Sequence, residues 1–361
     1  MEKIKVGIIG CGGIARGKHY PSLKGMDDVE IVAFCDIIPE RAQKLCDDYG
    51  NPNAKVYTDY KELLKDDSIV AVHVCTPNRS HSFITIDALE AGKHVMCEKP
   101  MAKTAAEARA MVEAAKKTGK LLTIGYQSRY RADSQYIKAA CDAGDLGEIY
   151  YAKAHALRRR AVPTWGVFLN EYEQGGGPLI DIGTHALDLT LWMMNNYSPK
   201  MVVGQTFKKI PGGPGTGNIW GDWKEDEYTV EDSAFGFVVM ENGAVISLES
   251  SWALNTLDVI EAKTTLCGTK AGADMRDGVR INGVKFGKQF VEKPNLDVGG
   301  VAFFDGASGS KPEQIEARVF YNAIEKGTPL CVYPEQALVV TEILEAIYTS
   351  AKTGEPVYFN K

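Results

Sequence analysis

Short apolar runs alternate with amphipathic stretches through the first third of the chain. A continuous apolar run is typical of a buried strand, and an apolar period of about 3.6 residues is typical of a helix packed on one side. Regular alternation of the two indicates a parallel, doubly wound sheet covered by helices. The predicted strands are Ile4–Ile9, Val29–Asp36, Ala54–Tyr57, Ile69–Cys75, His94–Cys97 and Leu121–Gly125. The predicted helices are Ile14–Lys24, Pro39–Tyr49, Asp59–Lys65, Ser80–Ala91 and Thr104–Thr118.

The pattern changes after residue 125, because strands then follow strands. We therefore expect an α/β protein of two domains: residues 1–124 with the parallel sheet, and residues 125–361 with an open-faced, mostly antiparallel sheet. The last helix is available to pack back on the first domain. The later predicted strands are Ile149–Leu157, Met201–Lys209, Ser233–Met240, Ala244–Ser251, Val259–Cys267 and Val279–Phe286. The later predicted helices are Ser134–Ala143, Leu179–Met194, Pro312–Lys326 and Pro334–Thr353, and the glycine-rich stretch Pro211–Trp223 is predicted to be a surface loop or lid.

Size and composition agree with a globular enzyme. A chain of 361 residues exceeds what one hydrophobic core usually supports, which again favours two domains. Apolar residues make up 45% and charged residues 24%, as in ordinary globular proteins. The net charge of -6, with both signs interspersed, argues against a nucleic-acid-binding surface. The expected partner is a small molecule.

The chain offers no membrane-spanning or disulfide pattern. No stretch approaches the roughly eighteen apolar residues that a membrane span needs, and the first residues lead directly into a strand. We therefore expect a cytoplasmic protein with no membrane partner. The eight cysteines lack paired or CxxC spacing, and Cys35, Cys75 and Cys97 lie in apolar runs. Neither disulfides nor structural zinc are expected.

A glycine-rich turn follows the first predicted strand. Gly10, Gly12 and Ala15 form G-x-G-x-x-A between that strand and a helix, which is the structural context of a dinucleotide-binding turn. The first glycine permits the tight turn, the second lets the backbone approach a pyrophosphate, and the small third residue allows close helix packing. The helix start supplies unpaired amide groups to the phosphates. The predicted cofactor-binding residues of the turn are Gly10, Gly12, Gly13, Ile14 and Ala15.

The second predicted strand ends at an acid, Asp36. A carboxylate at this position accepts hydrogen bonds from the ribose hydroxyl groups and repels a 2′-phosphate. No arginine follows directly, since the next residues are Ile37 and Ile38. The sequence therefore predicts NAD in preference to NADP.

Further motifs follow the later strands: TPNRSH at Thr76–His81, AGKHVMCEKP at Ala91–Pro100 and GYQSRY at Gly125–Tyr130. Together with GCGGIA after the first strand, they closely resemble the Gfo/Idh/MocA family, which is named for glucose–fructose oxidoreductase and inositol dehydrogenase. The resemblance covers essentially the whole chain, and E-K-P is its most specific element. This resemblance implies a Rossmann domain, a C-terminal domain built on an open-faced antiparallel sheet, and an active site between the two domains.

The resemblance implies a role for each residue of E-K-P. Lys99 would lie at the reacting carbon, Pro100 would often follow a cis bond, and Glu98 would orient the lysine or contact the ribose. Independently, these residues fall at the carboxyl end of a strand, where ligands of doubly wound sheets bind. A partly desolvated lysine there can stabilise an alkoxide-like transition state. The competing interpretation is a solvated lysine paired with its neighbour.

The residues after the fourth predicted strand are expected to line the nicotinamide side of the cofactor. Thr76, Pro77 and Asn78 end that strand, and His81 completes the same motif. An ordinary strand-to-helix turn is the alternative.

The segment GGGPLIDIGTHALDLTLWMM, from Gly175, is predicted to be a flexible glycine run followed by a strongly apolar, buried helix. Asp181, His185 and Asp188 share one face of that helix, and burying them is costly unless they are paired or face a cleft. An imidazole held by a carboxylate can remove an alcohol proton while hydride leaves the same carbon. The stripe matches the family's D-x-x-x-H element, which implies His185 as general acid/base and Asp181 as its partner or a substrate ligand. We expect a structural role for Asp188.

Other residues are candidates for the substrate wall. Trp165 is suited to stack on the apolar face of a sugar ring. Arg158 begins an arginine run, which is more often a solvated edge or an interface than a binding site, and Arg129 and Tyr130 follow the last strand of the first domain. A zinc site at Asp181 and His185 lacks further ligands, so we expect no metal.

Three functions remain open. The first is an NAD-dependent dehydrogenase or reductase of a sugar, polyol or sugar derivative. The second is a redox-neutral glycosidase, which some members of the family are, using the same lysine, histidine and hydride. The third, a non-enzymatic dinucleotide sensor, is disfavoured because Lys99, Asp181 and His185 are all present. The open sheet face predicts a homodimer or homotetramer that buries it.

Overall fold

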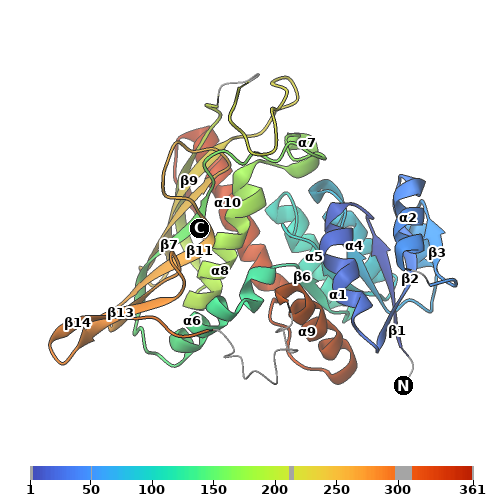
Figure 1. Ribbon diagram of the computed structural model, residues 1–361, viewed down its shortest axis with the longest axis horizontal. Helices are drawn as coiled ribbons and strands as arrows, with labels where there is room; N and C mark the ends of the chain where they lie inside the picture. Colours follow the sequence, from blue (N-terminus) through green and yellow to red (C-terminus); the bar gives the residue numbers. More distant parts are fainter. Residues whose placement is uncertain (1–2, 50, 211–214, 297–310, 360–361) are drawn as a thin grey trace, which may run out of the picture. The chain divides into compact units, whose positions relative to one another are not determined.

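The computed structural model describes residues 3–49, 51–210, 215–296 and 311–359 (Figure 1). The chain forms two compact units. The first is Met1–Gln127 with Lys311–Leu338, and the second is Ser128–Ser310 with Val339–Lys361. The first unit therefore contains a late segment that the expected division at residues 124 and 125 assigns to the second domain.

The first unit contains a parallel sheet of six strands in the order β3-β2-β1-β4-β5-β6. This is the doubly wound order in which ligands bind where neighbouring strands lead in opposite directions, here beyond β1 and β4. The strands are β1 (Ile4–Ile9), β2 (Val29–Cys35), β3 (Lys55–Tyr57), β4 (Ala71–Val74), β5 (His94–Cys97) and β6 (Leu122–Ile124). The helices are α1 (Tyr20–Lys24), α2 (Pro39–Tyr49), α3 (Tyr60–Leu64), α4 (His81–Glu90), α5 (Ala105–Thr118) and α9 (Pro312–Lys326).

Helix α9 contributes to the core of this unit, although it lies far along the chain. Ala317, Phe320 and Tyr321 are buried in the same apolar cluster as Ile8 and Phe34. The helix packs on α1, as Figure 1 shows. Helix α10 (Pro334–Thr353) begins in this unit and continues into the second.

The second unit contains a nine-stranded sheet in the order β14-β13-β12-β11-β7-β10-β9-β8-β15. Neighbours are antiparallel except β7 and β10, which run parallel, so the mostly antiparallel sheet expected from the sequence is confirmed. The strands are β7 (Ile149–Leu157), β8 (Pro199–Phe207), β9 (Ser233–Met240), β10 (Val245–Ser251), β11 (Ile260–Gly268), β12 (Ala271–Asp274), β13 (Arg280–Lys285), β14 (Lys288–Glu292) and β15 (Val357–Tyr358). The helices are α6 (Ala132–Asp142), α7 (Glu171–Gln174), α8 (Thr184–Met194) and most of α10.

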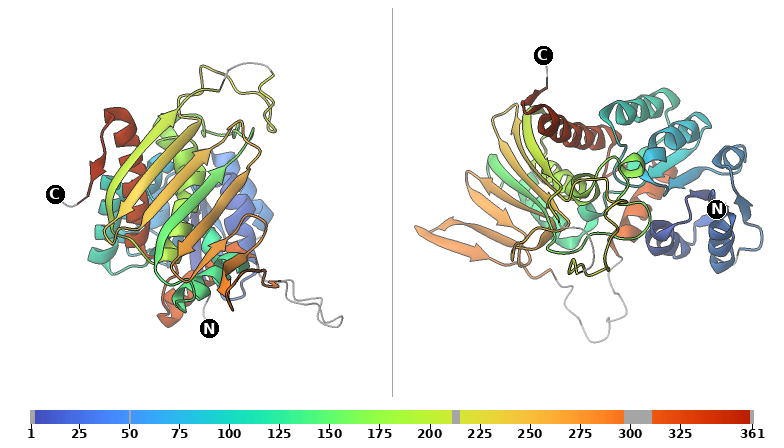
Figure 2. Two further views of the ribbon diagram at one scale, coloured as in Figure 1. Left: turned by 90° about the vertical axis from the view of Figure 1, so that its left-hand side faces the viewer. Right: turned by 90° about the horizontal axis from the view of Figure 1, so that it is seen from above.

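Helices cover one face of this sheet. Helix α8 packs on β7 and β11, and Ile347 of α10 lies where side chains at Gly204 and Gly236 would otherwise project. The opposite face carries Val203 and Phe237, which are 36% and 43% exposed, and no helix of the described residues covers it (Figure 2, left). The expected open face is therefore present.

Two predicted helices begin differently from expectation. The predicted helix Ile14–Lys24 is a wide π-helical turn at Ala15–His19 followed by the short α1, which has Pro21 in its first turn. The predicted helix Leu179–Met194 is likewise a π-helical turn, Leu179–Gly183, followed by α8. Of the predicted loop Pro211–Trp223, residues 211–214 lie outside the described residues, and residues 215–223 contain neither helix nor strand.

Candidate active site

The glycine-rich turn joins β1 to the π-helical turn. Gly10 has a φ of +91°, and a Cβ there would lie 2.7 Å from the main-chain carbon of Cys75, so the position requires glycine. Added Cβ atoms at Gly12 and Gly13 would meet no protein atom within 4 Å. Open space beside exposed amide groups is what a pyrophosphate needs, so the turn fits a dinucleotide.

The side chains of the turn agree with this arrangement. Ala15 is fully buried, as the small third residue of the motif should be, and Ile14 is 41% exposed. Burial raises the pKa of the Cys11 thiol to about 12, so this group stays neutral within the turn.

The carboxylate of Asp36 is tied to the main chain of the turn. Its Oδ2 accepts a hydrogen bond from the Cys11 amide at 2.8 Å, and its Oδ1 accepts one from the Ile38 amide at 2.9 Å. Each carboxylate oxygen has a further acceptor site, so the group remains able to accept ribose hydroxyl groups. Asp36 therefore also shapes the turn, a role that the sequence did not indicate.

The loop after β4 is open to a ligand at its start. Pro77 is exposed and Thr76 and Asn78 are half-buried. Among the residues that the structure describes, the hydroxyl oxygen of Thr76 has no hydrogen-bond partner. Pro77 and Asn78 are therefore accessible to a cofactor, whereas the Thr76 hydroxyl oxygen is buried, and the contact of these residues with NAD stays a prediction.

His81 has a different role from the one predicted. It is 1% exposed, and its Nδ1 and Nε2 lie 2.8 Å and 2.9 Å from the carbonyl oxygens of Pro100 and Thr76. Burial lowers the pKa of His81, and a neutral imidazole donates only one hydrogen bond, so the ring donates to one of these carbonyl groups and packs against the other. The interpretation of His81 as a cofactor ligand is wrong, because the ring is buried with both nitrogens facing main-chain oxygens.

The E-K-P residues follow β5. Lys99 is partly exposed between the buried residues Glu98 and Pro100, and the Lys99–Pro100 peptide bond is cis, as the resemblance implied. The Glu98 side chain does not turn to solvent. One of its oxygens binds Lys18 and His19 at 2.6 Å and 2.8 Å, and the other accepts the Lys99 amide at 3.2 Å. The predicted ribose contact of Glu98 is therefore replaced by a buried network.

The second set of candidate residues lies on the segment that leads into α8. Between Gly176 and Met193, Asp181 and His185 are the two residues that are not buried. The Oδ2 of Asp181 accepts a hydrogen bond from the indole of the buried Trp252 at 3.0 Å. One turn of helix thus presents a carboxylate and an imidazole together from an otherwise apolar element, and Trp252 fixes the carboxylate.

The glycines before this helix are needed for packing rather than flexibility. A Cβ at Gly176 would lie 2.0 Å from the hydroxyl oxygen of Tyr348, and one at Gly177 would lie 2.3 Å from the Glu231 carbonyl oxygen. The half-buried Glu231 carboxylate also accepts the amides of Gly177 and Leu179 at 2.8 Å and 3.1 Å. It satisfies the first amide groups of the helix, a function that the sequence analysis missed.

The structure corrects the prediction for Arg129. Its guanidinium is fully buried and forms a two-pronged ion pair with Asp188 at 2.6 Å and 2.9 Å. Asp188 is therefore structural, as expected, but Arg129 is structural too and does not form part of a substrate wall. Tyr130 is 6% exposed, which leaves little of its side chain for a ligand.

An aromatic cluster, Trp165, Phe168 and Trp220, lies on two loops of the second unit. The Trp165 and Trp220 rings meet edge to face at 4.8 Å and are 51% and 40% exposed. The guanidinium of Arg158 lies 5.4 Å from the Trp220 ring and is paired with Glu261 at 2.6 Å. Trp165 is thus accessible as predicted, and Trp220 is a further candidate that the sequence analysis missed.

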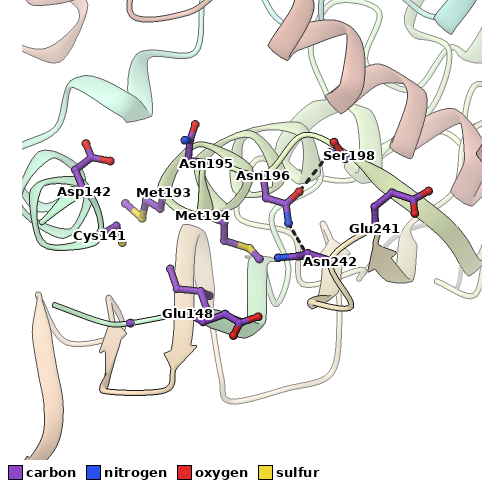
Figure 3. Close-up of a pocket in the computed structure, with 12 residues that line it drawn as sticks. Cys141, Asp142, Glu148, Met193, Met194, Asn195, Asn196, Ser198, Glu241 and Asn242 are labelled. Carbon is purple, nitrogen blue, oxygen red and sulfur yellow. Dashed lines mark hydrogen bonds between the residues drawn. The ribbon is translucent and has the colours of Figure 1, made fainter. Parts of the chain in front are cut away.

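A pocket at the other end of α8 lies apart from these residues. It is lined by Met193, Asn195 and Glu148 among others, and Asn196 donates to Asn242 at its rim at 3.0 Å (Figure 3). His185 lies in the first turn of α8 and Met193 in the last, so this pocket is not the candidate active site. Among the described residues, no cluster of three or more histidine, cysteine or acidic side chains could hold a metal, and no helix is long and apolar enough to cross a membrane.

Residues 4–126 match the family described as "Oxidoreductase family, NAD-binding Rossmann fold", and residues 134–274 match the "GFO/IDH/MocA C-terminal domain". The fold and the glycine turn therefore belong to an NAD-binding oxidoreductase. The chain is a member of the Gfo/Idh/MocA family, which confirms the resemblance seen in its motifs.

Relatives with known names act on sugars and polyols. The chain is 37% identical over 355 residues to D-glucoside 3-dehydrogenase of Escherichia coli, covering 98% of this chain and 97% of that protein. It is 33% identical over 193 residues to inositol 2-dehydrogenase of Salmonella typhimurium, covering 53% and 55%. The fold resembles levoglucosan dehydrogenase in complex with NADH and levoglucosan, with a TM-score of 0.81, 22% identity and 99% of both chains covered. The predicted class, an NAD-dependent oxidoreductase in a family of sugar and polyol dehydrogenases, is confirmed.

Proposed function

We propose that this enzyme oxidises a ring hydroxyl group of a glucoside or a related sugar and passes the hydride to NAD. The observation that carries the proposal is the half-exposed Asp181 and His185 pair on an otherwise buried helix. Similarity over nearly the full length to D-glucoside 3-dehydrogenase supports a glycoside as substrate.

In the proposed reaction, the hydride and the proton leave the substrate for different acceptors. Bound NAD supplies the hydride acceptor. His185 takes the hydroxyl proton as general base, and Asp181, held by Trp252, keeps the imidazole oriented. The Lys99 ammonium stabilises the developing charge on the substrate oxygen.

We further propose that NAD is preferred over NADP, because the Asp36 carboxylate lies beside the glycine turn. Trp165 and Trp220 offer ring faces to the sugar or to the group attached to it. We also propose a cytoplasmic location. The open sheet face is proposed to hold two or more copies together.

The test is a substrate screen with added NAD. Glucosides, free sugars and polyols are supplied, and NADH formation is followed by absorbance. One NADH for each oxidised molecule is the expected result. Release of the aglycone from aryl glucosides over many turnovers, without added NAD and without net NADH, would instead establish the redox-neutral glycosidase.

A further inference from the structure

A buried cluster of three charges lies in the first unit. The Lys18 ammonium lies 2.6 Å from a carboxylate oxygen of Glu98 and 2.8 Å from one of Glu316. All three side chains are at most 7% exposed. They come from distant parts of the chain: the π-helical turn after the glycine turn, the end of β5, and α9.

A hydrogen-bonded chain leads from α9 to the same carboxylate. Tyr321 lies 2.6 Å from His73 Nε2, His73 Nδ1 lies 2.6 Å from His19 Nδ1, and His19 Nε2 lies 2.8 Å from Glu98. Burial lowers the pKa of both histidines, so each ring is neutral and donates once. A single arrangement then satisfies every contact: the tyrosine donates to His73, His73 donates to His19, and His19 donates to Glu98.

The charges of the cluster do not balance. One ammonium faces two carboxylates, and a buried net charge of that kind is costly unless one carboxylate takes a proton. Burial by itself would raise the pKa of Glu98, but the Lys18 charge and the His19 hydrogen bond hold it well below its usual range. Burial raises the pKa of Glu316 to about 7, against the opposing charge of Lys18. Of the two carboxylates, Glu316 is therefore the one that takes up a proton near neutral pH.

Glu98 links the cluster to Lys99. Its second oxygen accepts the Lys99 amide at 3.2 Å, so this carboxylate joins the cluster to the main chain at the candidate catalytic lysine. The cluster is also tightly packed against the main chain after β6. A Cβ at Gly125, after β6, would lie 3.0 Å from both Glu98 Oε1 and Lys18 Nζ.

We propose that Glu316 is a positioning residue for Lys99. When protonated, it leaves the Lys18 ammonium to Glu98, which then holds the Lys99 amide. When ionised, it competes for the same ammonium and loosens that hold. The charged and titratable groups that face Glu316 are Lys18 from the π-helical turn, Glu98 from β5 and Glu313 from its own helix. The catalytic consequence rests on the function proposed above for Lys99.

The first test follows the Lys99 amide directly. Hydrogen exchange of the segment around Lys99 is measured between about pH 6 and 9, corrected for the intrinsic exchange rate, in the wild type, in Glu316→Gln and in Glu325→Gln, a change at an exposed residue of the same helix. Protection of that amide should fall severalfold above neutral pH in the wild type and in the control Glu325→Gln. It should stay constant in Glu316→Gln, which imitates the protonated acid. Equal pH dependence in all three proteins overturns the proposal, whether or not the proposed substrate is correct.

The second test uses turnover at saturating NAD and substrate. The kcat of the wild type should decline above about pH 7, and Glu316→Gln should lack that decline while keeping the same affinity for NAD. Gly125→Ala disturbs the cluster without changing its charge, so it should lower kcat at every pH with little effect on KM. An unchanged kcat in Gly125→Ala, together with coincident pH profiles for the wild type and Glu316→Gln, contradicts the positioning role. If the wild type turns over no sugar, the proposed function fails while the exchange experiment still decides this inference.

Discussion

At the scale of single residues, the two candidate catalytic side chains have a similar setting. Lys99 lies between buried neighbours after β5, and His185 lies between buried neighbours in the first turn of α8. Packed neighbours hold the main chain at both positions while the side chains stay accessible. Because the packed neighbours hold the main chain, the side chain of Lys99 or His185 can be replaced without loss of the fold.

Substitution of either residue should therefore separate turnover from binding. Lys99→Ala and His185→Ala are each expected to reduce kcat by roughly two to four orders of magnitude, because a positioned acid/base or charge stabiliser is lost. The Kd for NAD, measured by calorimetry, should change little. Lys44→Ala, an exposed lysine on α2, is the control and should behave as the wild type. Near-normal turnover in folded His185→Ala would move the general base elsewhere.

The Asp36 carboxylate offers a test of cofactor choice. Asp36→Asn keeps an oxygen that can accept the Cys11 amide but removes the negative charge. We expect weaker NAD binding by about 1–3 kcal/mol and a smaller preference over NADP, because repulsion of the 2′-phosphate disappears. Calorimetric titration with both cofactors measures the effect, with Asp47→Asn on α2 as control. A wild type that already binds NADP more tightly contradicts the assignment.

The sequence motifs identified several residues of the candidate site, but they did not reveal which groups these residues contact. The motifs singled out Glu98 and His81, but a single sequence does not show that Lys18 and His19 reach Glu98, or that two carbonyl groups enclose His81. One signal was present. Lys18 follows the buried Ala15 by three positions, so a charged residue falls on the buried side of the predicted helix and requires a partner.

At the scale of elements, the strands and most helices could be predicted because their apolar patterns are local. The π-helical turns could not, since no local apolar pattern distinguishes a π turn from an α-helical one, and the second of them packs closely around Gly183. A Cβ at Gly183 would lie 3.0 Å from the Ser250 hydroxyl oxygen on β10. The glycines at 176 and 177 likewise serve contacts with residues far along the chain, which no local pattern reveals.

The Arg129–Asp188 pair anchors α8 and gives a prediction for stability. Arg129→Met leaves a buried carboxylate unpaired and should lower the free energy of unfolding by about 3–5 kcal/mol. The double variant Arg129→Met/Asp188→Leu should recover most of that loss. Urea unfolding measures both, and Arg131→Met, whose partner Asp133 is partly exposed, is the milder control. Unchanged stability of Arg129→Met with a raised KM would return Arg129 to the substrate site.

At the scale of the whole molecule, the predicted division into a parallel and a mostly antiparallel sheet is the observed one, because each sheet type leaves its own pattern of apolar runs. The return of residues 311–338 to the first unit could not be seen, since it depends on contacts between segments almost a chain length apart. The parallel pairing of β7 with β10 also joins segments that are distant in the sequence, so no local pattern reveals it.

The uncovered sheet face predicts self-association. Phe237→Lys places a charge on that face, next to Val203 on the neighbouring strand. Sedimentation velocity should show an oligomer for the wild type and a smaller species for this variant, because a charge cannot be buried there without a partner. Leu257→Lys, in an exposed loop, should leave the assembly unchanged. A wild type that sediments as a monomer excludes this use of the face.

Because α9 forms part of the core of the first unit, it constrains when this unit can fold during synthesis. During synthesis the six parallel strands leave the ribosome long before Phe320 and Tyr321, which complete their core. Until then, Lys18 has one of its two carboxylate partners, and the apolar surface that α9 covers is open to water. Domains usually fold in the order of their synthesis. Here the core of the first unit is completed only after residues 320 and 321 have been made, so this unit cannot finish folding before most of the second unit has been synthesised.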